Sequence, residues 1–168
     1  YRQATRLSPN AAHLYNEWAL VFMHMGQLDE AQARLDRSFA LDQEYEDTYF
    51  WQGELARLRG DLAGAETAYR QALALAPNML DAQRGLASLY TQAGRWAQAI
   101  EALNGILRLQ PNDLSAHFSL AQVYQQTGDL PNALIHARLA RENASDAQRP
   151  LVEQLLASIE QEMVDREQ

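Results

Sequence analysis

Residues 46–79 read EDTYFWQGELARLRGDLAGAETAYRQALALAPNM, and the spacing of small residues in this stretch recurs along the chain. Four glycines lie 34 residues apart, and an alanine follows each of them five positions later. A second series of small residues lies seven positions before each glycine. A fixed period of this length is typical of stacked structural repeats. The glycines are Gly26, Gly60, Gly94 and Gly128, the alanines are Ala31, Ala65, Ala99 and Ala133, and the second series is Ala19, Gly53, Ala87 and Ala121.

Each period contains two segments compatible with a helix, for example residues 78–93 and 96–109. Repeats end in Pro77-Asn78 and Pro111-Asn112, and the same pair occurs upstream as Pro9-Asn10. The asparagine of each of these pairs is expected to cap the first helix that follows, since the proline cannot extend the preceding helix. The glycine is expected to adopt the left-handed conformation that ends a helix. Two such helices joined by a few residues lie antiparallel, and stacking the pairs covers their apolar faces. The sequence therefore predicts an all-α solenoid of antiparallel helix pairs.

The period sets the expected organisation of residues 1–168 as a single array. Beyond residue 145 the period stops. There, an i, i+4 apolar stripe backed by Val152 and Leu156 predicts a capping helix; the stripe consists of Leu151, Leu155, Ile159 and Met163. The expected parts are a partial repeat over 1–11, which supplies only a second helix, complete repeats over 12–45, 46–79, 80–113 and 114–147, and the capping helix over 148–168.

Composition excludes several classes of protein. The formal net charge is -8, which argues against affinity built on neutralising phosphates of nucleic acid or anionic lipid heads. The chain has no cysteine, so disulfides, thiolate metal sites and cysteine nucleophiles are excluded. It contains no apolar run of the roughly 18 residues needed to span a bilayer, and we expect no direct membrane binding. Because it lacks a starting methionine and opens inside a repeat, we expect it to be part of a longer protein.

The chain shows no motif of an enzyme or a cofactor site. The four histidines have no metal-ligand spacing, and the glycines never form a phosphate-binding loop. We therefore predict no catalytic residues, no cofactor and no metal. An acidic cluster could collect a hard cation but lacks the calcium-loop spacing, and complementation of a helix dipole is the favoured interpretation. Its members are Asp42, Glu44, Glu46 and Asp47.

The pattern of aromatic, small, tyrosine, glycine, alanine and proline positions resembles that of the tetratricopeptide repeat (TPR) family. The second repeat matches best, and the resemblance extends over residues 1 to about 147. It implies a right-handed superhelix whose first helices line a concave groove that binds extended peptides or helices of other proteins. The matching residues of the second repeat are Tyr49, Gly53, Gly60, Ala65, Tyr69, Ala72 and Pro77.

The resemblance also implies which positions face the groove. Phe50 and Phe118 stand where a purely structural repeat could use any polar residue, and exposed aromatic rings near an arginine are typical of interaction hot spots. The alternative is that these rings pack against the next repeat. The candidate groove residues are His13, Asn16, Leu20, Phe50, Trp51, Glu54, Arg57, Arg84, Phe118 and Gln122.

These observations predict a non-catalytic module that binds a protein or peptide segment in its groove. A second hypothesis is self-assembly, because the incomplete first repeat exposes the apolar side around Tyr1 and Ala4, on which a second copy could stack. A third comes from residues 10–19, NAAHLYNEWA, which are similar to repeat tails of bacterial membrane proteins of the O-antigen ligase and polymerase type. In that case, this module would position a partner of a membrane-anchored protein. The cellular compartment is not predicted.

Overall fold

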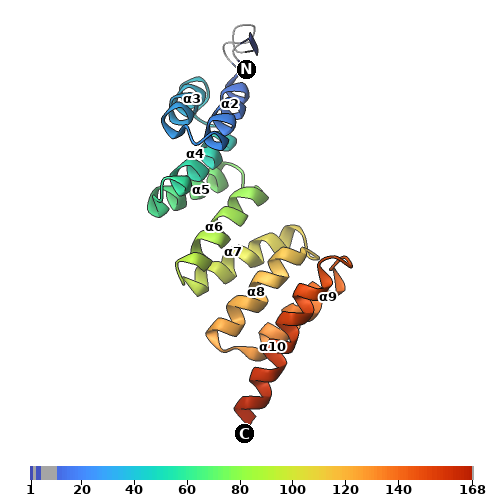
Figure 1. Ribbon diagram of the computed structural model, residues 1–168. Helices are drawn as coiled ribbons and strands as arrows, with labels where there is room; N and C mark the ends of the chain where they lie inside the picture. The colour runs from blue at the N-terminus through green and yellow to red at the C-terminus, as the bar shows by residue number, and fades with distance from the viewer. Residues whose placement is uncertain (2, 5–10, 168) are drawn as a thin grey trace. The chain divides into compact units, whose positions relative to one another are not determined.

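The computed structural model describes residues 1, 3–4 and 11–167, in which helices follow one another through short turns (Figure 1). The chain divides into two compact units, unit 1 (Tyr1–Gly85) and unit 2 (Leu86–Gln168). The expected partial repeat falls largely on residues 2 and 5–10, outside the described residues. The helices are α2 (Ala12–His24), α3 (Leu28–Leu41), α4 (Glu46–Leu58), α5 (Leu62–Leu75), α6 (Leu80–Gln92), α7 (Trp96–Leu109), α8 (Leu114–Thr127), α9 (Leu130–Glu142) and α10 (Arg149–Glu167).

The helices pack as the repeat pattern predicts. In unit 1, α2 packs on α3, α4 packs on α5, and α4 also contacts both α2 and α3. In unit 2, α8 packs on α9, while α7 contacts α8 and α10 contacts α9 and α8. Figure 1 shows successive helices running in opposite directions within these pairs. The predicted all-α solenoid of antiparallel helix pairs is confirmed.

Four glycines end the first helix of each pair. Their φ angles lie between 66° and 79°, a region that side chains strongly disfavour. Each is followed by a residue whose amide donates to a carbonyl five residues back, as in Gln27 N to Phe22 O at 2.9 Å and Asp129 N to Tyr124 O at 2.9 Å. This bond is the signature of the Schellman motif. The predicted left-handed glycine at the helix end is confirmed.

The expected asparagine caps are wrong. The N-cap of α8 is Asp113, whose side chain accepts a hydrogen bond from Ala116 N at 2.7 Å. The Asp113 amide donates to Gln110 O at 3.0 Å, so Pro111 and Asn112 form the centre of a turn and the helix begins after it. Proline favours the first central position of such a turn.

The small residues of the repeat pattern lie in the core. Ala31, Ala65, Ala99 and Ala133 have no exposed surface, and Ala19 and Ala121 are equally buried. Small side chains at these crossings let the helix backbones approach closely, and the larger Leu35, Leu103 and Leu120 fill the space beside them.

We expect Ala99→Leu to lower the free energy of unfolding by about 1–3 kcal/mol, because three extra carbons must enter a fully packed crossing. Urea denaturation followed by circular dichroism measures this change. Ala63→Leu places the same side chain on an exposed position of α5 and should leave stability nearly unchanged. Equal stability of the Ala99→Leu variant and the unmodified chain would contradict the packing described here.

The terminal helix α10 forms, and Pro150 lies in its first turn. Its predicted apolar stripe is partly wrong. Val152, Leu156 and Ile159 are buried, whereas Leu151 is 59% exposed. The reason is geometric: each i, i+4 step advances about 40° around a helix, so a stripe built only from such steps drifts off one face. The buried positions follow the i, i+4, i+7 spacing instead, with Leu155 and Met163 half-buried beside them.

Candidate functional site

The predicted groove residues of α2 have different environments. His13 is exposed, and Leu20 is half-buried against the core of unit 1. Asn16 is only 2% exposed, which corrects its expected place in the groove. Its Nδ2 donates to Thr48 Oγ1 at 3.1 Å, and Thr48 Oγ1 lies 2.9 Å from Ser38 Oγ. Asn16 therefore holds α2 to α4 and is not available to a partner.

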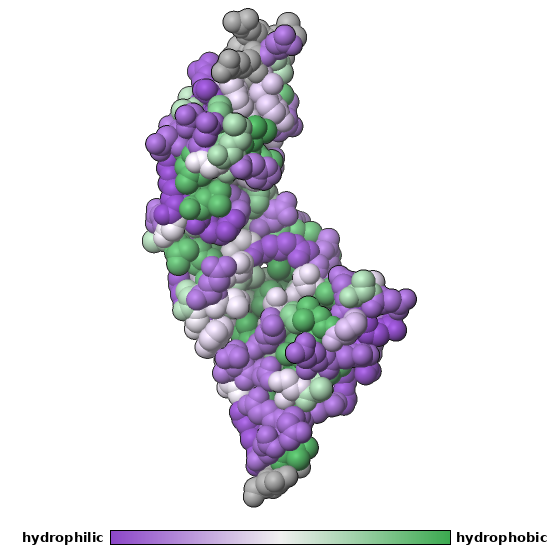
Figure 2. Space-filling view, viewed as in Figure 1, coloured by the Kyte–Doolittle hydropathy of each residue, from purple (hydrophilic) through white to green (hydrophobic). Residues whose placement is uncertain are grey.

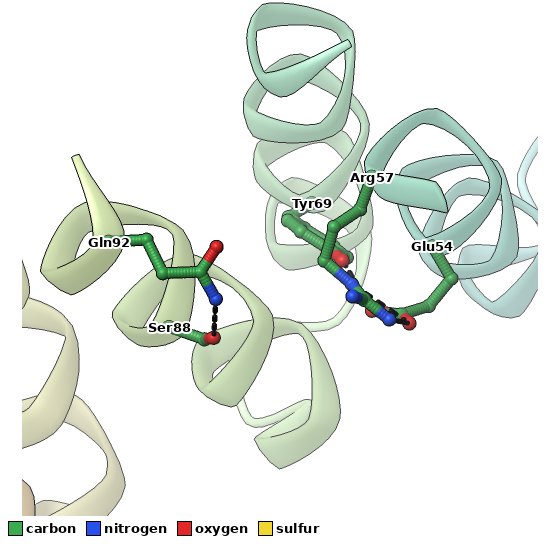
Figure 3. Close-up of polar contacts among 5 residues, drawn as sticks. All are labelled: Glu54, Arg57, Tyr69, Ser88 and Gln92. Atoms are coloured by element: carbon green, nitrogen blue, oxygen red, sulfur yellow. Dashed lines mark hydrogen bonds and ion pairs between the residues drawn. The ribbon is translucent and has the colours of Figure 1, made fainter. Parts of the chain in front are cut away.

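Three groove candidates lie at i, i+4 and i+7 on α4, namely Phe50, Glu54 and Arg57. The Arg57 guanidinium contacts Glu54 at 2.7 Å, and Tyr69 of α5 donates its hydroxyl hydrogen to the same carboxylate (Figure 3). The hydrogen bonds that Arg57 donates to Glu54 raise the pKa of Arg57. Burial raises the pKa of Tyr69, and the Glu54 carboxylate raises it further. The Glu54 carboxylate is thus held in place by hydrogen bonds from two sides, and Arg57 balances its charge.

Tyr69 is fully buried between two glycines. A Cβ atom on Gly53 of α4 would lie 2.6 Å from the Tyr69 ring, and one on Gly85 of α6 would lie 2.7 Å from it. The absence of side chains at Gly53 and Gly85 is what admits the ring between the helices. The core of unit 1 therefore extends up to the hydroxyl that meets Glu54.

The aromatic candidates of α4 pack against each other and against neighbouring side chains of unit 1. The Phe50 and Trp51 rings lie 4.8 Å apart edge to face, and the Phe50 and Tyr69 centroids are 6.1 Å apart. Both Phe50 and Trp51 are half-buried, and Trp51 contacts the core of unit 1. Arg84 of α6 is also half-buried. Phe50 keeps part of its surface exposed beside the Glu54–Arg57 pair.

Within unit 2, the first helices present mainly uncharged polar groups. Ser88 of α6 is exposed and accepts a hydrogen bond from Gln92 at 3.1 Å (Figure 3). The candidate Gln122 of α8 is exposed, and the candidate Phe118 is half-buried against the core of this unit. Figure 2 shows that hydrophobic residues on the visible face form small patches among hydrophilic residues.

Phe118 lines a pocket of about 340 Å³, here called the Phe118 pocket. One wall comes from α8, and the other comes from the start of α10 and the residue before it. Sequence reasoning placed Phe118 at the surface but missed the opposite wall, because it assigned Leu151 to the buried stripe. The lining consists of Leu114, Ser115, Phe118 and Ser119 on one side and Gln148, Leu151 and Val152 on the other.

Polar contacts fix α10 against α8. Gln125 donates to Ser158 Oγ at 3.0 Å and to Glu162 at 3.4 Å. Arg166 donates to the Gly128 carbonyl at 3.1 Å, where a cation also complements the negative end of the α8 dipole. These contacts lie on the half of α8 away from the Phe118 pocket, whose residues come from the first turns of that helix.

Two histidines meet in unit 2, which sequence reasoning did not predict. His117 of α8 is buried, and its Nδ1 lies 3.0 Å from Nδ1 of His136 on α9. His117 Nε2 lies 2.9 Å from the Pro111 carbonyl, which can only accept, so Nε2 carries a hydrogen. Neutral His117 therefore accepts at Nδ1, and His136 donates. The Tyr124 ring stacks on His136 at 5.6 Å.

We expect acid to destabilise unit 2 through this pair. Burial lowers the pKa of His136 below its ordinary value of about 6.5, and a charge on His117 lowers it further. Below pH 6.5 the unfolded chain then binds more protons than the folded one, so stability falls as pH decreases through this window. Thermal denaturation between pH 7.5 and 5 measures the effect, and His136→Asn should weaken it. His13→Asn, at an exposed position of unit 1, should not.

The described residues contain no group of three or more His, Cys, Asp or Glu that could hold a metal ion. In the acidic cluster, Glu46 and Asp47 lie in the first turn of α4, where carboxylates complement the helix dipole. The Asp42 side chain accepts from Glu44 N at 3.0 Å, and Tyr45 donates to Asp47 at 2.8 Å.

Among the helices of the described residues, none combines the length and the apolar composition of a membrane span.

Comparisons with known proteins identify relatives of this chain. Two family models, both of the tetratricopeptide repeat, match residues 16–79 and 56–120. BBSome complex member BBS4 from Bos taurus is 27% identical over 103 residues, which are 61% of this chain. The chain spans only 20% of the length of that relative.

Solved structures share the fold. The crystal structure of YrrB, a TPR protein with an unusual peptide-binding site, matches 99% of this chain and 84% of its own, with a TM-score of 0.80 and 19% identity. MamA from Desulfovibrio magneticus RS-1, beginning at its residue 41, matches 93% of this chain and 87% of its own, also with a TM-score of 0.80 and 19% identity.

Proposed function

Because the chain belongs to the tetratricopeptide repeat family, we propose that it is a non-catalytic binding module whose first helices hold a peptide segment or helix of a partner protein. The family membership supports a protein–protein interaction scaffold. The proposal adds that, in each unit, the groove-facing side of its first helices is the surface used.

The observation that carries the proposal is a partly exposed phenylalanine at the same position of two repeats. Phe50 and Phe118 are each the fifth residue of their 34-residue unit, and both are half-buried. Aromatic side chains that rest on a core with one face open are the anchors that dominate many interfaces. Phe50 lies beside the Glu54–Arg57 pair, and Phe118 lines a pocket.

The remaining proposed contacts surround these two anchors. Asn16 is left out because it is buried. YrrB, a TPR protein with an unusual peptide-binding site, has the same fold, which supports a peptide as the ligand class. The proposed contact set is His13, Leu20, Phe50, Trp51, Glu54, Arg57, Arg84, Phe118 and Gln122.

A peptide-display selection on the immobilised chain tests the proposal. Phe50→Ala and Phe118→Ala are made separately, and the affinity of the selected peptides is measured by fluorescence polarisation. We expect at least one of them to weaken binding about tenfold, which corresponds to about 1.4 kcal/mol.

The control variants are Leu58→Ala on α4 and Ile135→Ala on α9, which truncate exposed apolar side chains outside the groove positions. They should bind the selected peptides with unchanged affinity. Enrichment of no peptide, or equal losses in the control variants, would refute the proposed surface.

A further inference from the structure

We infer that the Phe118 pocket accepts one uncharged, apolar side chain of a bound peptide, with leucine, isoleucine, methionine or phenylalanine as the fitting residues. The inference rests on the proposed function and specifies the chemistry of its ligand. It concerns unit 2 alone, since both walls of the pocket belong to α8 and the start of α10.

The size of the pocket fits a single side chain. Its volume of about 340 Å³ is near the lower end of the roughly 300–1,000 Å³ range of small-molecule sites. A pocket of this size suits the anchor residue of a peptide better than a nucleotide or another large cofactor. The rest of the peptide would remain outside, over the exposed side of α8.

The charge of the pocket selects the kind of side chain. None of the seven described lining residues is charged, so a carboxylate or ammonium placed there would lose water without gaining a counter-ion. The apolar walls are Phe118 and Leu114 on α8 and Leu151 and Val152 on α10. The lining therefore complements a neutral, apolar group.

Leu151 is the exposed part of this apolar wall. It is 59% exposed, although Val152, Leu156 and Ile159 of the same helix are buried. An apolar side chain held between Leu151 and Phe118 would remove apolar surface of both from water. The two residues thus form opposite contacts for one inserted group.

A polar donor lies at the same pocket. Gln148 Oε1 accepts hydrogen bonds from Ser145 Oγ at 2.7 Å and Ser145 N at 3.2 Å, which fixes the orientation of the amide. Its Nε2 hydrogens are then the groups that a peptide carbonyl would use. The bonds from Gln125 and Arg166 also hold α10 on α8, so the pocket walls are preorganised.

A second copy of this chain is the less favourable occupant. Each copy carries a formal charge of -8, so two copies repel as they approach. A pocket built by seven residues is also much smaller than the 20–30 residues per partner of a standard protein interface.

The test uses the full chain and two kinds of probe. N-acetyl-leucine amide and N-acetyl-phenylalanine amide are titrated into the ¹⁵N-labelled chain, with the corresponding lysine and glutamate derivatives as charged comparisons. We expect saturable shift changes at amides 114–119 and 148–152 with the apolar probes, and responses at least fivefold smaller with the charged probes. Selected peptides from the display experiment provide the second probe.

The matched variants are Leu151→Glu and Val164→Glu, which place the same charge at two exposed positions of α10. Leu151→Glu should abolish the response to the apolar amides and lower the affinity for the selected peptides about tenfold. Val164→Glu should change neither quantity. Amide shifts elsewhere, unchanged binding in Leu151→Glu, or shifts of these amides with chain concentration alone would overturn the inference; the last result would indicate a second copy.

The two proposals fail in different ways. If selected peptides bind but Leu151→Glu does not affect them, the pocket inference is wrong and the protein-binding function stands. If the apolar amides bind the pocket but no peptide is enriched, the proposed function is wrong, and the pocket is not a peptide subsite.

Discussion

Tyr69→Ala should lower the free energy of unfolding of unit 1 by about 3–5 kcal/mol, the cost of deleting a large buried aromatic side chain. Tyr69 is fully buried, and Gly53 and Gly85 on either side have no side chains that could refill the space. Hydrogen exchange of amides in α4 and α5 under increasing urea measures the loss within this unit. The variant also removes the Tyr69 hydroxyl that donates to Glu54, so the loss of exchange protection should include the amide of Glu54.

Tyr69→Phe is the matched control for this prediction. It keeps the ring between the two glycines and removes only the hydrogen bond to Glu54, so we expect a loss of about 1 kcal/mol. Equal losses in the two variants would mean that the hydroxyl, rather than the packed ring, holds the helices together. A small loss in both would contradict the burial of this side chain.

Thr48→Val should lower the free energy of unfolding by about 1–3 kcal/mol, although valine has nearly the same shape. The substitution removes the oxygen that bonds Asn16 at 3.1 Å and Ser38 at 2.9 Å, both of which are buried. Ser38 keeps its hydrogen bond to the Ala12 carbonyl at 3.0 Å, so Asn16 is the buried group that loses its partner, at a cost of about 1–3 kcal/mol. Because these residues belong to α2, α3 and α4, the loss should appear in the exchange rates of all three helices.

Thr67→Val makes the same change at an exposed position of α5 and serves as the control. Thr67 bonds only the Ala63 carbonyl of its own helix, and that carbonyl remains accessible to water and to the helix ladder. We expect a change below about 0.5 kcal/mol there. If Thr48→Val were as mild as Thr67→Val, the buried network would contribute nothing to the packing of α2 on α4.

The periodic part of the fold was predictable because it depends on local steric requirements. A left-handed residue at a helix end requires glycine, and a close helix crossing requires a small side chain, so both leave a regular trace in the sequence. The second helix of the third repeat, predicted over 96–109, is observed as Trp96–Leu109. The cap of α8 was mislocated because the Pro111-Asn112 turn moves the start of the helix to the following Asp113.

The side-chain network of Asn16, Ser38 and Thr48 was not predictable in the same way. Its members come from three helices, and nothing in the repeat period marks a polar residue as buried. Only contact between the helices shows that Asn16 turns toward Thr48 rather than toward the surface. The His117–His136 pair was missed for the same reason, since its members are 19 residues apart on successive helices.

Predicting the Phe118 pocket would have required the rotation of α10 about its own axis. Sequence periodicity identified α10 as amphipathic but could not decide between two apolar faces that differ by less than a third of a turn. Packing on α8 and α9 selects the face of Val152, Leu156 and Ile159 and leaves Leu151 outside. Phe118 is half-buried and lines the pocket, and the wall that completes this pocket could be located only from the structure.

The contribution of α10 to this pocket has a consequence for protein engineering. Replacing α10 with an additional consensus repeat would lengthen the solenoid and at the same time erase Gln148 and Leu151 from the cavity. Lengthening the array would therefore remove the proposed ligand site. Conversely, residues 145–166 could be grafted onto the last repeat of another solenoid that has a phenylalanine at the equivalent position. The graft would supply the second wall of the pocket opposite that phenylalanine.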